Sequence, residues 1–146
     1  MFSTLVNLAN ELGIDVEFWD FEPPLDAVYW SIPGMPPVIG IAEHLLNKPR
    51  LLNCIMAEEL GHHYTTTGDA LPKTHFHYAN KLKISRAEYR ALRWAAQYLI
   101  PLEKLDECNF NRIFTVWDLA DYFDVTEEFM TFRLGLPDMP MVMEWR

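Results

Sequence analysis

Apolar residues recur every three or four positions from Leu5 to Leu12, and Gly13 follows them. This spacing predicts a short amphipathic helix that stops at the glycine. Apolar and polar residues then alternate, which is the spacing of half-buried strands, and turn-forming residues separate the alternating runs. The predicted strands cover residues 14–21, 27–32 and 38–41. Three successive short strands predict a small antiparallel sheet.

Helical spacing dominates the rest of the chain. The predicted helices cover residues 49–64, 85–100, 116–123 and 127–134. A sheet that is followed by helices is typical of the α+β class. Because no repeat, low-complexity tract or long linker divides the chain, we expect a single domain over residues 1–146.

The size and charge of the chain limit the classes of function that it can have. A chain of 146 residues that is 50% hydrophobic can build a core without a disulfide or a metal, so a bound metal would serve chemistry. Its formal charge of -9 disfavours direct binding to nucleic acid and to anionic membranes. No apolar segment is long enough to span a membrane, and Cys54 and Cys108 lack a paired spacing. We expect a cytoplasmic protein with reduced thiols.

The last two predicted helices have the pattern of a helix-turn-helix, with Thr115 and Thr126 as caps. Their acidic residues, with almost no basic residue nearby except Arg133, would face phosphate, so charge excludes DNA binding. We interpret their apolar residues as a packing face. That predicted face consists of Trp117, Leu119, Ala120, Phe123, Phe129 and Leu134.

The segment Cys54-Ile-Met-Ala-Glu-Glu-Leu-Gly-His-His63 concentrates residues that bind metal or move protons. Glu58 and His62 are four apart and share a helical face, while Glu59 lies at its edge. The zinc-peptidase motif His-Glu-x-x-His has this geometry, with two ligands at the outer positions and a general base between them. Glu58 stands here in place of the first histidine.

Two interpretations of this helix stay open from the residues alone. Glu and His are ordinary residues for a solvated helix face, and on this interpretation the exposed residues are Glu58, Glu59, His62 and His63. However, Gly61 costs about 1 kcal/mol inside a helix, and it would let another segment approach closely.

A catalytic zinc site usually has three protein ligands, so a third is expected downstream. The candidates are Asp69, His75, His77 and Glu88. Glu88 also completes a capping box with Ser85, which is a purely structural role. His75 and His77 are two residues apart and do not share a helical face, so we interpret them as surface residues or loop contacts.

Three runs of the chain resemble the ImmA/IrrE metallopeptidase family. They are Ala-Glu-Glu-Leu-Gly-His-His-Tyr-Thr at 57–65, Glu-Tyr-Arg-Ala at 88–91 and Trp-Ala-Ala-Gln-Tyr-Leu-Ile-Pro at 94–101. The resemblance implies a zincin-like single domain. It also implies a cytoplasmic zinc-dependent endopeptidase of a phage or mobile element that cleaves a helix-turn-helix repressor.

The resemblance assigns roles to the matching positions. Glu59 matches the general base, His62 a ligand and Glu88 the acidic third ligand, while Glu58 occupies the first ligand position, where many relatives have histidine. Two carboxylates would cancel the charge of a divalent ion, so manganese would compete better with zinc. We expect His63 beside the ligands or facing the substrate.

The expected mechanism is hydrolysis by metal-activated water, with the substrate backbone paired to the strand at 38–41. Because Glu58 departs from the commonest pattern, an alternative function is also predicted. A catalytically degenerate peptidase fold would act as a protein-binding or regulatory module.

Overall fold

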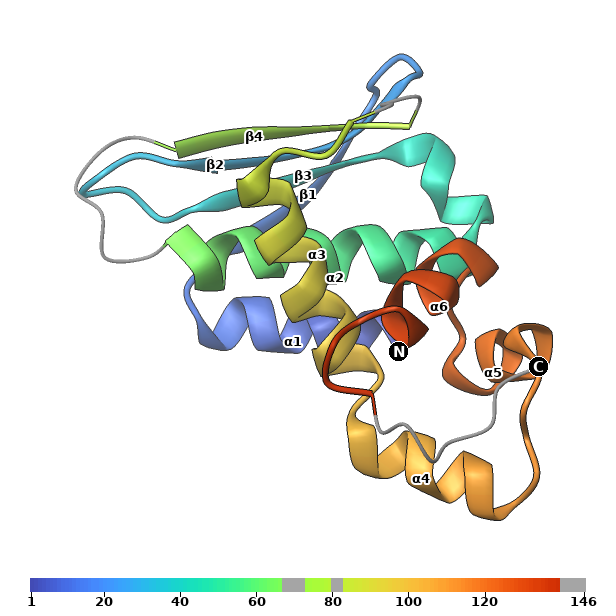
Figure 1. Cartoon of the computed structure of the whole chain (residues 1–146). Helices are drawn as coiled ribbons and strands as arrows, with labels where there is room; N and C mark the ends of the chain where they lie inside the picture. Colours follow the sequence, from blue (N-terminus) through green and yellow to red (C-terminus); the bar gives the residue numbers. More distant parts are fainter. Residues whose placement is uncertain (67–72, 80–82, 140–146) are drawn as a thin grey trace.

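The computed structural model describes residues 1–66, 73–79 and 83–139 and confirms the α+β class (Figure 1). The elements are α1 (Phe2–Glu11), β1 (Asp15–Trp19), β2 (Leu25–Ser31), β3 (Val38–Ala42), the 3-10 turn η1 (Glu43–Asn47), α2 (Pro49–Thr66), β4 (Lys73–Tyr78), α3 (Arg86–Leu99), α4 (Leu102–Phe110), α5 (Val116–Phe123) and α6 (Glu127–Leu134). The last two helices match the predicted ranges at both ends. Strand β4 and helix α4 were not predicted from the sequence.

The sheet is mixed rather than antiparallel. Its four strands lie in the order β1-β3-β2-β4, and β2 is antiparallel to both of its neighbours. β1 pairs with β3 in parallel, from Asp15 opposite Val38 to Trp19 opposite Ala42. The prediction of an antiparallel sheet failed because β3 inserts between β1 and β2, so the first and third strands run in the same direction.

The strand at 38–41 cannot pair with a substrate, contrary to the sequence-based expectation. β3 is hydrogen-bonded to β1 on one side and to β2 on the other, so its main-chain groups are already used. Within the described residues, the edges of the sheet are β1 and β4.

Helix α2 is the central element of the fold. Figure 1 shows it running beneath the sheet, with α1 below it and α3 crossing it. A Cβ atom added to Gly61 of α2 would lie 2.2 Å from the carbonyl oxygen of Ala91 in α3. The expectation that this glycine admits a close neighbour is therefore confirmed, and the neighbour is α3.

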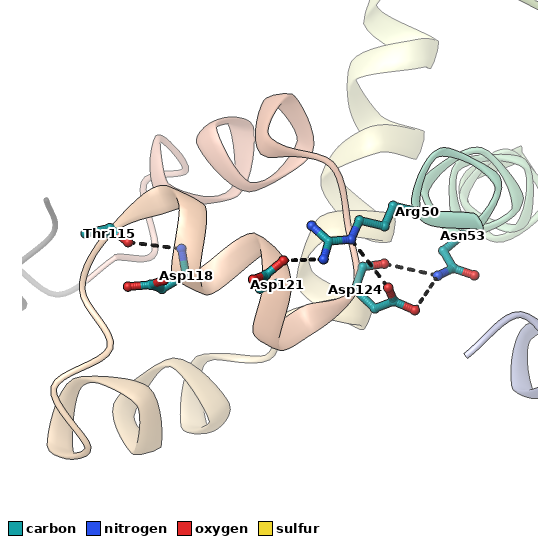
Figure 2. A network of polar contacts seen from close by, with 6 residues as sticks. All are labelled: Arg50, Asn53, Thr115, Asp118, Asp121 and Asp124. Carbon is teal, nitrogen blue, oxygen red and sulfur yellow. Dashed lines mark hydrogen bonds and ion pairs between the residues drawn. The ribbon is translucent and has the colours of Figure 1, made fainter. Parts of the chain in front are cut away.

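A polar network fixes the junction of α5 and α6 to the start of α2 (Figure 2). Asn53 Nδ2 donates to the carbonyl oxygen of Asp124 at 3.0 Å and to its Oδ2 at 3.2 Å. Arg50 forms ion pairs with Asp121 and with Asp124. Asp124 itself has a left-handed backbone, with φ 57°, and ends α5. These contacts place α6 beside α2.

The predicted packing face of the terminal helices is confirmed except at one residue. Thr115 and Thr126 cap α5 and α6 as expected, and Leu119, Ala120, Phe123 and Phe129 are buried. Trp117 is 68% exposed, because it follows the Thr115 cap on the side of α5 that faces away from the core.

Cys54 and Cys108 are both buried free thiols, in agreement with the expectation of unpaired cysteines. Among the helices that the structure describes, none combines the length and apolar character needed to cross a membrane.

Candidate active site

The motif residues Glu58, Glu59 and His62 of helix α2 lie in the interior of the protein. Glu58 is 7% exposed, Glu59 is 0% exposed and His62 is 3% exposed. The alternative that they form an ordinary solvated face is therefore wrong. The sheet, α1 and α3 cover this helix from several sides, which its own sequence pattern did not reveal. Ionisable residues are rarely buried to this degree unless they are paired or functional.

The carboxyl group of Glu59 is fully enclosed. Neither of its oxygens has a hydrogen-bond partner among the residues that the structure describes. Burial raises the pKa of Glu59 well above its ordinary value, and the negative charges of Glu58 and Glu88 raise it further. Such a group needs either a proton or a nearby cation.

Glu58 is paired with a histidine from the sheet. Its Oε2 lies 3.1 Å from Nδ1 of His77 on β4. Burial alone would lower the pKa of His77, but the hydrogen bond to Glu58 and the negative charges of Glu58, Asp26 and Glu88 outweigh it and raise this pKa. The protonated form of His77 is therefore favoured.

His75 also lies at the site. Its ring stacks on that of His62, with centroids 4.0 Å apart and planes 13° from parallel. The interpretation of His75 and His77 as surface or loop residues is wrong, because it tested only helical spacing. On a strand, residues two apart share a face, and both histidines of β4 are partly buried toward α2. The alternating stretch Lys-Thr-His-Phe-His-Tyr was the available indication of that strand.

The cap of α3 by Ser85, which is one half of the predicted capping box, is confirmed. Ser85 Oγ accepts a hydrogen bond from the backbone N–H of Glu88 at 3.1 Å and lies 3.2 Å from its Oε1, to which it donates. The assignment of Glu88 as a ligand stays a prediction. Asp69, another candidate for the third ligand, lies outside the described residues.

A cavity of about 460 Å³ lies between α2, β4, α3 and α6. The carboxylates and the imidazole of its lining come from Asp26, Glu58, His77, Glu88 and Glu128. Apolar side chains such as Ile55, Leu92, Phe129 and Phe132 form much of the remaining wall. Glu58 and Glu88 thus share one cavity, whereas Glu59 and His62 do not line it.

His63 contacts Tyr29 of the sheet, whose ring also lies near that of His75, with centroids 6.1 Å apart. Its Nδ1 lies 3.0 Å from the hydroxyl of Tyr29 on β2. Burial lowers the pKa of His63. Burial also raises the pKa of Tyr29, with a smaller contribution from the charge of Glu59, although a hydrogen bond to Ser31 opposes this. Tyr29 thus lies close to both His63 and Glu59.

The acidic and histidine side chains of the site offer ligand atoms for a metal, but they do not surround one point. Within the described residues, no three His, Cys, Asp or Glu side chains form a group that could hold an ion. Glu58 is turned toward His77, and Glu88 toward Ser85. The donor chemistry nonetheless fits a divalent cation, since the buried oxygens of Glu59 lack donors and are repelled by two carboxylates.

Comparison with known proteins agrees with this arrangement. The fold is of the metallopeptidase type. It places carboxylates and imidazoles between a mixed sheet and a helix with the motif Glu-Glu-x-x-His. Residues 9–135 match the family model of the IrrE N-terminal-like domain, a peptidase family, and the chain belongs to that family. The resemblance to ImmA/IrrE proteins is thereby confirmed. No curated protein and no solved structure matches the chain.

Proposed function

We propose that the chain is a cytoplasmic metal-dependent endopeptidase that cleaves a helix-turn-helix repressor of a phage or mobile element. The observation that carries the proposal is the enclosed carboxyl of Glu59 between Glu58 and Glu88, in a chain of a peptidase family. This is the position at which the zinc-peptidase motif has its general base.

Glu58, His62 and Glu88 are the residues that would hold the metal. Zinc supplies Lewis acidity, which polarises a scissile carbonyl and makes water a better nucleophile. Because two of these three ligands are carboxylates, a harder ion such as manganese is the second candidate.

We assign both proton transfers of the hydrolysis to Glu59. Its carboxylate takes a proton from the attacking water and delivers it to the nitrogen of the leaving amine. The burial that raises its pKa favours keeping that proton between the two transfers. The substrate backbone would pair with β4, since β4 is an edge strand and its His77 lines the cavity.

The charge of the cavity supports a basic protein substrate. Four carboxylates lie on its wall, from Asp26, Glu58, Glu88 and Glu128. DNA-binding proteins carry clusters of lysine and arginine, so a segment of such a repressor has the complementary charge.

A second function is favoured by the contacts that the site makes. Glu58 is paired with His77, the carboxylate of Glu88 accepts from the hydroxyl of the cap Ser85, and Glu59 does not line the cavity. A degenerate peptidase fold that binds a regulatory protein without cutting it would have these features.

Cleavage by a Glu59 variant distinguishes the two functions. The purified chain is incubated with Zn²⁺ or Mn²⁺ and a helix-turn-helix repressor from the same genetic element, and new N-termini are identified by mass spectrometry. Because a general base contributes roughly 10²–10⁴-fold, Glu59→Gln should lower the cleavage rate by about 100-fold or more.

Glu17→Gln is the matched control, because Glu17 is exposed on β1. It should cleave like the wild type. Equal cleavage by Glu59→Gln and Glu17→Gln would remove Glu59 as the base. Binding of the repressor without any cleavage would favour the degenerate module.

A further inference from the structure

We propose that His77 of β4 is a metal ligand of this site and shares the ion with Glu58 on the wall of the cavity. The inference rests on the proposed metal-dependent function and deepens it. It assigns an imidazole from the sheet to a site whose helix has Glu58 where a histidine is common.

The first support is the distance between the two donor atoms. His77 Nδ1 and Glu58 Oε2 are 3.1 Å apart. With zinc bonds of about 2.0–2.1 Å and tetrahedral angles, neighbouring ligand atoms lie about 3.3 Å apart. The hydrogen-bonded pair is therefore only slightly closer than two ligands of one ion, so a bound ion would replace the proton between them after a small side-chain movement.

The second support is the charge around the pair. His77 is the one imidazole among the described residues that line the cavity, and no lysine or arginine is among them. Asp26, Glu58, Glu88 and Glu128 surround it with carboxylates. A divalent ion bound by His77 and Glu58 would neutralise more of this negative charge than the imidazolium of His77 alone.

The third support is the environment of His77. Ligating histidines are commonly oriented by a carboxylate that does not itself bind the metal. Asp26 is 3% exposed, lines the same cavity and lies close enough to His77 for their charges to interact. His44 Nε2 lies 3.5 Å from Asp26, which helps to fix that carboxylate.

Calorimetric titration with Zn²⁺ tests the assignment. The wild-type chain, His77→Ala and His77→Gln are freed of metal by a chelator and titrated, with circular dichroism as the check on folding. Loss of a partner outside the ligand shell typically weakens metal binding by about 10–100-fold. We expect both His77 variants to weaken zinc binding by more than about 100-fold.

Thr74→Ala is the matched control, because Thr74 lies on the same strand, is exposed and does not line the cavity. It should bind zinc within about 10-fold of the wild type. A loss of less than about 100-fold in folded His77 variants would overturn the assignment, and so would equal losses in Thr74→Ala and His77→Ala.

The outcomes also separate this inference from the proposed function. Zinc binding that is insensitive to His77, with repressor cleavage intact, overturns the inference alone. Zinc binding that depends on His77, without cleavage, supports the inference and contradicts the peptidase. A wild-type chain that binds neither Zn²⁺ nor Mn²⁺ in the same titration overturns both.

Discussion

Gly61 sets the distance between the two helices that carry Glu58 and Glu88. Its missing side chain lets α2 lie against the backbone of α3 at Ala91. The close approach of these two helices therefore depends on this small residue.

Gly61→Ala should destabilise the protein. The added Cβ would meet backbone at 2.2 Å, which no side-chain rotation relieves. Overpacking costs about 1–3 kcal/mol, helix propensity returns about 1 kcal/mol, and we therefore expect a net loss of up to about 2 kcal/mol. Urea unfolding followed by circular dichroism measures the change.

Gly135→Ala is the control for that substitution. The nearest atom to its added Cβ is 3.6 Å away, and its backbone is right-handed. Its stability should stay within about 0.5 kcal/mol of the wild type. If Gly61→Ala were equally harmless, the helices would not be held as closely as described.

At the scale of elements, a polar network joins the α5–α6 junction to α2, and α6 also packs against α3. Asn53 is 2% exposed and makes two hydrogen bonds to Asp124, one to the main chain and one to the side chain (Figure 2). Phe129 and Phe132 of α6 then form part of the cavity wall. The network therefore links the start of the motif helix to the far wall of the site.

Asn53→Ala should lower the free energy of unfolding by about 1–3 kcal/mol, because the carbonyl of Asp124 loses a donor in a partly buried position. Thermal and urea unfolding measure the loss. Asn7→Ala on the exposed side of α1 is the matched control and should change stability little. Equal stability of the two variants would show that the junction is held by apolar packing alone.

At the scale of the whole molecule, the charge of -9 is distributed so that it opposes DNA binding. Asp118, Asp121, Glu127 and Glu128 of the terminal helices are all exposed. Arg133 is 1% exposed and donates instead to the carbonyl of Ile100 at 2.8 Å and to Asp138. The helix pair has the order of a helix-turn-helix without a basic surface.

We therefore expect no binding to duplex DNA, even at low salt. A gel-shift assay at about 50 mM salt, with a helix-turn-helix repressor as the positive control, should retard only the repressor complex. A shift by this chain that weakens steeply as salt rises would contradict the expectation, because that dependence reports phosphate contacts.

Local periodicity was sufficient for several elements and failed for others. The caps Thr115 and Thr126 defined α5 and α6, because a cap depends on residues three positions apart. β4 was missed because its half-buried face consists of His75 and His77, which lack the apolar character that indicates a strand. The parallel pairing of β1 and β3 depends on strand order, which local periodicity does not specify.

The sequence by itself determined the α+β class, the motif helix with Glu58, Glu59 and His62, and the family, because these depend on residue types and spacings along one segment. Only the tertiary structure decided that these residues are buried and that β4 brings His75 and His77 to them. The physical reason is that burial and pairing depend on which segments cover a helix, and those segments are distant in the chain.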